Sequence, residues 1–130
     1  VGDTATDFEH QTFGDELRRC QRYFIRFKRF GASGALCNIS YYTASAAYGT
    51  IHFPTDMRSN PSMASSSGTN DFRIYAQANG GETFNSVGGL QAHETKCMVI
   101  QISSLSGLEG APGWLECATT SATLDFSSEL

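Results

Sequence analysis

Five aromatic side chains offer the plainest binding chemistry in this sequence of 130 residues. A flat apolar ring matches the C–H face of a sugar, and a tyrosine hydroxyl or an indole N–H can add a hydrogen bond at its edge. Aromatic residues are equally common in cores and in contacts between subunits. The sequence therefore favours core or interface positions, with a sugar-binding platform as the alternative that makes them candidate ligand-binding residues, for Tyr41, Tyr42, Tyr48, Tyr75 and Trp114.

Side chains arranged for catalysis are scarce in this sequence. It contains no GxSxG, HExxH, phosphate-binding loop or glycine-rich dinucleotide motif. Two carboxylates, Asp56 close to Arg58 and Glu116 in an apolar stretch, could form the acid and base of a glycoside hydrolase. Any acidic protein offers such pairs, so we predict a protein that is not an enzyme, with glycan hydrolysis as the alternative.

The histidines and cysteines show no metal-binding spacing. They are His10, His52 and His93, and Cys20, Cys37, Cys97 and Cys117. Zinc ligands usually come in close pairs, and the sequence has no CxxC pair. We predict neither a metal nor another cofactor, and we expect the cysteines to be small buried apolar side chains. Disulfide bonds are the alternative that an even number of cysteines permits.

Most of the positive charge lies in DELRRCQRYFIRFKRF, residues 15–30. Basic residues interleaved with aromatic ones are typical of some nucleic-acid surfaces. However, six basic and two acidic side chains give this segment a charge of +4, so the remainder of a chain with a net charge of −4 carries −8. That remainder would repel a polyanion. We expect no nucleic-acid partner, and we expect the cations to face solvent or acidic residues of a neighbouring subunit.

Patterns of period two predict the strands that position these residues. In residues 21–28, Tyr23, Ile25 and Phe27 form an apolar face opposite a basic one, after a helical turn that Asp15 could cap. Further strands are predicted over residues 36–44, 48–53, 71–78, 82–87, 95–103, 114–120 and 122–130, with a weaker candidate around Met63. About eight short strands separated by Gly or Asn indicate an all-β fold, an antiparallel, jelly-roll-like β-sandwich.

The stretch HFPTDMRSNP, residues 52–61, predicts a rigid connection after one of these strands. Pro54 cannot donate a hydrogen bond to a neighbouring strand, so the strand ends there. Met57 suits an irregular apolar gap. Arg58 carries five donors, which could bind carbonyl groups or a carboxylate in the loop.

The stretch ATDFEHQTFGDELRRCQRYF followed by FPTDMRSNP resembles a domain at the C-terminal ends of tail-fibre and other virion proteins of tailed phages and environmental viruses. Its members commonly show stretches similar to ATPFEHRSFGEELALCQRYY and FPVPMRATPT, and many end in DAEL where this chain ends in SSEL. This chain departs from the pattern at Asp7, Arg18, Arg19 and Phe24. The matched positions of the motif core are Cys20, Gln21, Arg22, Tyr23, Phe53, Pro54, Met57, Arg58 and Pro61.

The resemblance implies a virion structural module at the end of a tail fibre or spike. Its expected role is recognition of a host-surface glycan, assembly of a trimeric tip, or both. A polysaccharide-modifying domain (a depolymerase or deacetylase) and a purely structural trimerisation cap are the alternatives. The expected partners are two further copies in a homotrimer, a host cell-surface glycan or protein, and an upstream fibre domain. The expected location is the virion, after synthesis in the host cytoplasm.

The start of the sequence, which lacks a methionine, suggests a fragment of a longer protein. We predict that residues 1–14 are a linker from a preceding domain and that residues 15–130 form the C-terminal β-sandwich domain. No run of eighteen apolar residues is present, so we predict no membrane insertion.

Overall fold

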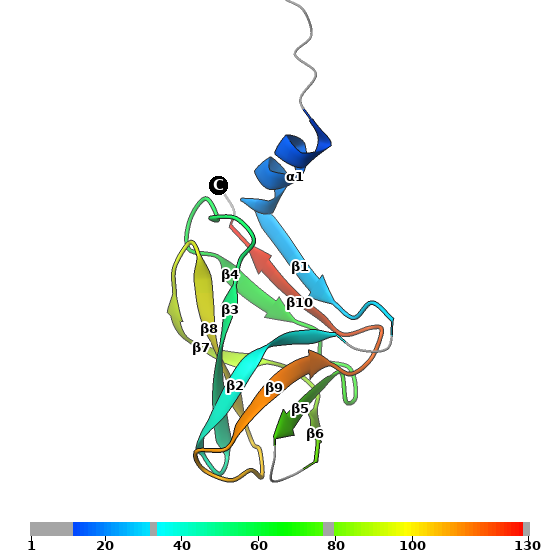
Figure 1. The fold of residues 1–130 in the computed structure, drawn as a ribbon, viewed down its shortest axis with the longest axis vertical. Helices are drawn as coiled ribbons and strands as arrows, with labels where there is room; N and C mark the ends of the chain where they lie inside the picture. The colour runs from blue at the N-terminus through cyan, green and yellow to red at the C-terminus, as the bar shows by residue number, and fades with distance from the viewer. Residues whose placement is uncertain (1–11, 32–33, 77–79, 129–130) are drawn as a thin grey trace, which may run out of the picture.

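Ten antiparallel strands and one short helix form the part of the chain that the computed structural model describes, residues 12–31, 34–76 and 80–128 (Figure 1). The predicted all-β sandwich with a short N-terminal helix is confirmed. In chain order, the elements are α1 (Phe13–Gln21), β1 (Phe24–Lys28), β2 (Ala35–Thr43), β3 (Ala46–His52), β4 (Ser62–Ser65), β5 (Phe72–Ala76), β6 (Glu82–Phe84), β7 (Gly88–His93), β8 (Cys97–Ser103), β9 (Pro112–Cys117) and β10 (Thr123–Ser127).

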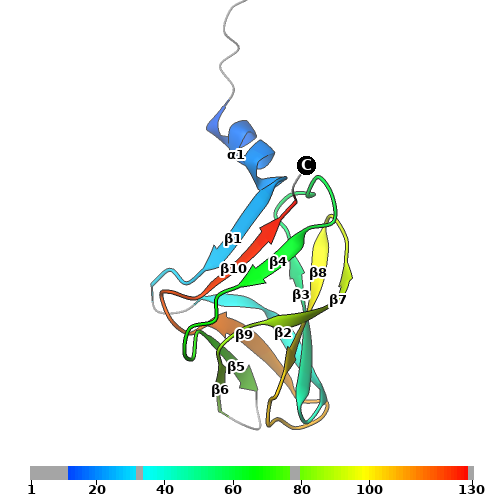
Figure 2. The same ribbon diagram turned by 180° about the vertical axis from the view of Figure 1, so that it is seen from behind.

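The strands form one large sheet and one small sheet. The seven-stranded sheet has the order β6-β5-β9-β2-β3-β8-β7, and the three-stranded sheet has the order β1-β10-β4. Figures 1 and 2 show the small sheet in the half of the molecule that is closest to α1. β10 lies between β1 and β4, with Ile25 opposite Phe126 on one side and Met63 opposite Phe126 on the other.

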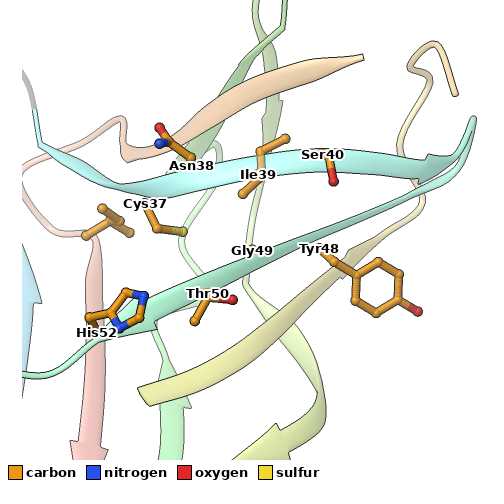
Figure 3. A pocket seen from close by; sticks show the side chains of 9 residues that line it. Cys37, Asn38, Ile39, Ser40, Tyr48, Gly49, Thr50 and His52 are labelled. Carbon is orange, nitrogen blue, oxygen red and sulfur yellow. The ribbon is translucent and has the colours of Figure 1, made fainter. Parts of the chain in front are cut away.

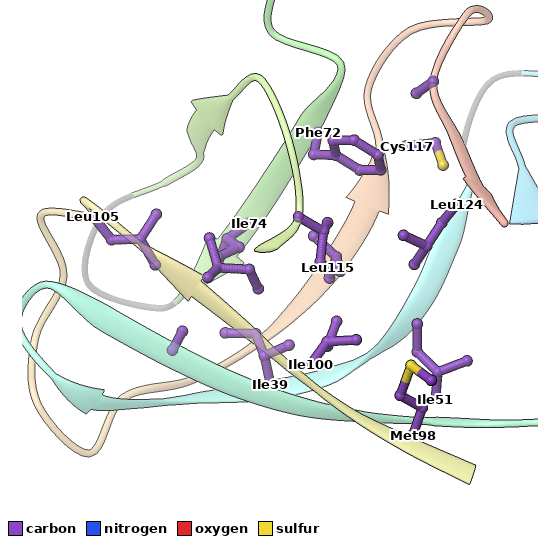
Figure 4. Packing of buried hydrophobic residues seen from close by; sticks show 14 of the residues in the cluster. Ile39, Ile51, Phe72, Ile74, Met98, Ile100, Leu105, Leu115, Cys117 and Leu124 are labelled. Atoms are coloured by element: carbon purple, nitrogen blue, oxygen red, sulfur yellow. The ribbon is translucent and has the colours of Figure 1, made fainter. Parts of the chain in front are cut away.

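The core lies between the two sheets and is built by alternation along the strands. In β8, Met98, Ile100 and Ile102 are buried, and they alternate with half-buried residues. β10 contributes Leu124 and Phe126 from the small sheet, both fully buried. Figure 4 shows the aliphatic side chains of several strands meeting in this layer. Burial of each large apolar side chain stabilises the fold by about 1.5–3 kcal/mol, so this layer is the main source of stability.

The N-terminal part of the fold differs from the prediction in two respects. Thr12, rather than Asp15, caps α1: its hydroxyl accepts a hydrogen bond from the Asp15 backbone N–H at 3.3 Å and donates one to the Asp15 carboxylate at 2.7 Å. The helix begins earlier than predicted, which places Asp15 in its first turn. In β1, Ile25 is buried and Phe27 half-buried, as predicted, but Tyr23 is exposed because it lies in the turn before the strand.

The structure also bears on the remaining predictions for strands, for the domain boundary and for membrane spans. The weak candidate around Met63 forms β4, and β7 was not predicted. The predicted boundary between residues 14 and 15 falls inside α1, whereas residues 1–11 of the predicted linker lie outside the described part of the chain. Among the described residues, no helix has the length and apolar character needed to cross a bilayer.

Candidate ligand-binding site

Trp114 and Tyr75 lie side by side on the outer face of the seven-stranded sheet. They are directly opposite each other in the pairing of β9 with β5, and their ring centroids are 5.2 Å apart at an interplanar angle of 31°. Their chain neighbours Leu115 and Ile74 are buried in the core, so the two rings point the other way. Trp114 is 47% exposed. The pair therefore presents an aromatic surface that a ligand can reach.

The two rings and Asn38 line a shallow depression of about 550 Å³, the aromatic depression. Asn38 lies on β2, directly opposite Trp114, and is exposed. Its amide offers two donors and one acceptor beside the indole ring. The remaining lining is mostly apolar: Ile39, Ala76, Pro112 and Gly113. At Gly113 a Cβ atom would lie 2.3 Å from the Tyr75 carbonyl oxygen, so the close approach of β9 to β5 requires glycine.

Arg73 and Glu116 hold the edge of this aromatic surface. They are opposite each other two positions along β5 and β9 from the Tyr75–Trp114 pair, and therefore lie on the same face of the sheet. Arg73 Nε donates to Glu116 Oε1 at 2.9 Å, and the Nη2 group of Arg73 contacts the same oxygen. The guanidinium carbon of Arg73 lies 4.4 Å from the centroid of the Tyr75 ring. Tyr75 is thus held between a cation and the indole, and the two charges neutralise each other.

A second depression, of about 640 Å³, adjoins the first between β2 and β3 (Figure 3). We call it the polar depression, and its polar lining side chains are Asn38, Ser40, Tyr48, Thr50 and His52. The register of β2 with β3 runs from the Ile39–Gly49 pair to the Thr43–Ala46 pair. Beyond Ile39, β2 has an irregular register with β9 between Ala35 and Cys37. The polar depression shares Asn38 and Ile39 with the aromatic one.

The five predicted aromatic residues fall into three groups. Trp114 and Tyr75 form the pair described above. Tyr42 and Tyr48 form an edge-to-face pair with centroids 5.6 Å apart, and Tyr42 is exposed. The prediction that Tyr41 could bind a ligand is wrong: Tyr41 is 2% exposed, so its ring cannot stack on a ligand.

Tyr41 has a structural role instead. It lies on the inner face of β2, and its hydroxyl donates to Glu82 Oε2 at 3.1 Å. Burial and the neighbouring Glu82 carboxylate raise the pKa of Tyr41 to about 12. Glu82 also accepts a hydrogen bond from the Ser106 backbone N–H at 2.8 Å. These contacts tie β2 to the edge strand β6 and to the loop after β8.

The sequence analysis did not identify the polar residues of the site. Asn38 and Ser40 flank Ile39, which is buried, so alternation along β2 directs both toward the outer face. Thr50 follows from the same rule in β3, next to the buried Ile51. The signal was therefore present in the pattern, but the polar residues carry no motif that separates a binding residue from a solvated one.

The two carboxylates considered for the alternative of glycan hydrolysis belong to separate ion pairs. Glu116 is buried and bound to Arg73, whereas Asp56 is exposed and lies 3.9 Å from the Lys96 ammonium. The guanidinium carbon of Arg58 lies 5.5 Å from the centroid of the Tyr23 ring. Among the residues that the structure describes, no three His, Cys, Asp or Glu side chains group to hold a metal ion.

All four cysteines are free. Cys117 is buried and Cys37 and Cys97 are half-buried, but Cys20 is exposed on α1, so the prediction of four buried cysteines is wrong there. Cys20 is exposed because α1 projects beyond the sandwich and none of its residues is buried (Figure 1). Burial raises the pKa of the Cys37 thiol to about 12 and that of Cys117 to about 11.

The two stretches that carry the resemblance meet at a structural junction. The Arg58 backbone N–H donates to the Arg22 carbonyl at 2.8 Å, and its guanidinium donates to the Tyr23 hydroxyl at 3.3 Å. The Ser128 N–H donates to the Tyr23 carbonyl at 2.8 Å. Met57 is buried beneath the loop. Arg58 thus ties the loop to the segment before β1, but its side chain binds the Tyr23 hydroxyl rather than the predicted carbonyl groups or carboxylate of the loop.

The basic face of β1 is partly neutralised within the chain. Arg26 donates to both carboxylate oxygens of Asp125 on β10, at 2.8 and 2.6 Å. This bidentate contact raises the pKa of Arg26 above its ordinary value. Lys28 lies 4.8 Å from the Phe30 ring centroid. Arg26 therefore has its acidic partner in the same chain, which weakens the argument for an acidic neighbouring subunit at this position.

Comparison of the chain with family models, curated proteins and solved structures gives no match. The assignment of the site therefore rests on its geometry alone.

Proposed function

We propose that this protein is a non-enzymatic glycan-binding module and that it acts at the end of a virion fibre. The observation that carries the binding role is the pair of the half-buried Tyr75 and the exposed Trp114, with Asn38 beside it. The virion setting, and the host-cell surface as the source of the glycan, rest on the resemblance of the two N-terminal stretches to fibre domains. The residues that carry the resemblance do not line the aromatic depression, so the binding role and the virion setting can be tested separately.

The chemistry of the aromatic depression fits a sugar. Ligand sites commonly have volumes of about 300–1,000 Å³ and combine apolar or aromatic walls with a few polar groups. The aromatic depression, at about 550 Å³, has this composition. A pyranose ring has an apolar C–H face, which can stack on Trp114, and hydroxyl groups at its edge, which can bind the Asn38 amide. These complementary features favour a sugar over a purely apolar ligand.

The carboxylates support binding rather than hydrolysis. Glycoside hydrolases use two carboxyl groups that flank the scissile bond. Glu116 is the carboxylate on the strands of the aromatic depression, and it is buried and paired with Arg73. Glu116 is therefore better suited to positioning Arg73 than to acting as a general acid.

A glycan array probed with the wild-type protein and two variants tests this function. Trp114→Ala should reduce binding at least tenfold, because it removes the stacking surface. Phe30→Ala is the matched control, since Phe30 is an exposed aromatic residue outside both depressions. Binding that survives Trp114→Ala unchanged would contradict the assignment of the site. New reducing ends or released acyl groups after incubation with bound glycans would instead establish a polysaccharide-modifying enzyme.

A second candidate function, a trimerisation cap, is favoured by helix α1. Phe13, Leu17 and Cys20 recur at spacings of four and three residues, which places them on one helix face. Phe13 is 79% and Leu17 44% exposed, and no described α1 side chain is buried. Figures 1 and 2 show α1 projecting beyond the sandwich. A helix of nine residues is not stable alone in water, so packing against copies of itself would stabilise it.

Sedimentation velocity at micromolar concentration tests the cap. A homotrimer is expected, and Leu17→Gln should dissociate it, whereas Arg18→Gln, one position along and off the apolar face, should not. A monomer at low salt would contradict the cap and leave a monomeric binding module. A trimer that dissociates in Arg26→Glu but not in Leu17→Gln would move the interface to the basic face of β1.

A further inference from the structure

We infer that the ligand is an uncharged oligosaccharide that crosses four strands of the large sheet and occupies the aromatic and polar depressions together. This inference rests on the proposed glycan-binding function and names the class of glycan. It follows from three properties of the outer face: the continuity of the two depressions, the change of chemistry along them, and the balance of charge.

The two depressions form one continuous track across β5, β9, β2 and β3. Tyr75 is opposite Trp114, and Trp114 is opposite Asn38. Across the next strand, Ile39 is opposite Gly49, and their chain neighbours Asn38 and Thr50 both line the polar depression. Three spacings of about 4.8 Å separate β5 from β3, so the track is about 14 Å long. One pyranose ring does not fill this length, whereas a short chain of sugars does.

The chemistry of the lining changes along the track. At one end, Tyr75 and Trp114 offer aromatic faces for stacking. Asn38 lies where the two depressions join, and it can bind hydroxyl groups on either side. At the other end, Tyr48 and Thr50 offer hydroxyl groups that can donate or accept (Figure 3). The arrangement suits one sugar stacked on the indole and the following sugars held by hydrogen bonds.

The charge of the track favours a neutral ligand. Within β5, β9, β2 and β3, all in the described part of the chain, Arg73 and Glu116 are the two formally charged side chains when His52 is neutral. These two bind each other, and Arg73 also lies over Tyr75. A sialylated or sulfated sugar would bring a charge that needs a cationic partner when it is desolvated. The net charge of −4 further disfavours an anionic glycan.

The test uses neutral hexose and N-acetylhexosamine oligosaccharides of one to four residues, together with their sialylated and sulfated counterparts, first on an array and then by titration calorimetry. Affinity should rise with chain length up to about three residues, because the track spans about three strand spacings. Tyr48→Phe, which removes one hydroxyl group, should lower the affinity for a trisaccharide roughly fivefold and leave that for a single sugar unchanged. Tyr42→Phe is the matched control, because Tyr42 packs on Tyr48 but lines neither depression.

The outcomes separate this inference from the proposed function. If no glycan binds, both are overturned. If single sugars bind as tightly as trisaccharides and binding depends on Trp114, the glycan-binding function stands and the extended ligand is refuted. Binding confined to sialylated or sulfated glycans refutes the neutral ligand. An equal loss of trisaccharide affinity in Tyr48→Phe and Tyr42→Phe refutes the role of the polar depression.

Discussion

Asp71→Asn would test how the loop before β5 is attached to the rest of the sandwich. Asp71 is 2% exposed. Its Oδ1 atom accepts hydrogen bonds from the Thr119 hydroxyl at 2.6 Å and the Ser121 hydroxyl at 3.1 Å, and its Oδ2 atom accepts one from the Gly68 backbone N–H at 2.9 Å. One carboxylate therefore joins the loop that enters β5 to the connection between β9 and β10.

The expected loss follows from the number of acceptors. Asparagine has one side-chain oxygen, so its NH₂ group must face either the Gly68 N–H or the two hydroxyls. The loss of a hydrogen bond to a charged group costs about 1.5–3 kcal/mol, and a buried donor left without an acceptor adds about 1–3 kcal/mol. Partial rotation of the two hydroxyls offsets some of this cost. We expect the free energy of unfolding to fall by about 3 kcal/mol, which corresponds to a decrease in Tm of roughly 10 °C.

The pH dependence supplies a second signature. The hydrogen bonds, led by that from Thr119, lower the pKa of Asp71. A carboxyl group with a lowered pKa in the folded state contributes stability that is present above its unfolded pKa of about 3.9 and is lost as the pH falls through the folded value. The difference in stability between wild type and Asp71→Asn should therefore be full at pH 7 and should shrink below about pH 4.

Urea denaturation at pH 7, 5, 3 and 2 measures both effects. Asp56→Asn is the matched control, because Asp56 is exposed and its partner Lys96 is 3.9 Å away. A surface pair of this kind contributes less than about 1 kcal/mol. A loss in Asp71→Asn no larger than that in the control, or a difference that stays constant down to pH 2, would refute the role assigned to the Asp71 carboxylate.

Two further predictions concern the core and the thiols. Phe27 packs edge-to-face on Phe126 with centroids 5.9 Å apart. Phe27→Asp should abolish the cooperative melting transition, because a charge in that contact has no partner. A soluble variant with an unchanged melting curve would contradict the strand assignment. Cys20, which is exposed, should react with a thiol reagent at pH 8 in the folded protein. Cys37, whose pKa is about 12, should react only after denaturation, because the thiolate is the reactive form. Equal reaction rates of the two thiols in the folded protein would contradict this prediction.

Alternation made most of the fold predictable from the sequence. In CMVIQIS the apolar residues at every second position predicted β8, and the structure places them in the core. β7, Gly88–His93, begins with two glycines and has two irregularities in its pairing with β8, so it offers no alternation to detect. Thr12 was missed as a cap because Asp15 is an equally good candidate by residue type.

The site was less predictable, because its geometry depends on strand pairing. Tyr41 and Tyr42 are adjacent and alike in type, and the inward or outward choice depends on the register of β2 with its neighbours. Tyr75 and Trp114 are far apart in sequence, and the pairing of β5 with β9 brings them into contact. The sequence indicated which residue types can bind a sugar, but the partners of each one are a property of the folded sheet.

The central position of β10 in the small sheet constrains the order in which the protein can fold. β1 and β4 have no contact with each other in the sheet order and both pair with β10. The Arg26–Asp125 contact spans 99 positions of the chain. β10 is therefore the last of the three strands of this sheet to be synthesised. Contacts of this sequence separation slow folding and prolong exposure of apolar surface, so Ile25, Phe27 and Met63 lack their partners in β10 until late in synthesis.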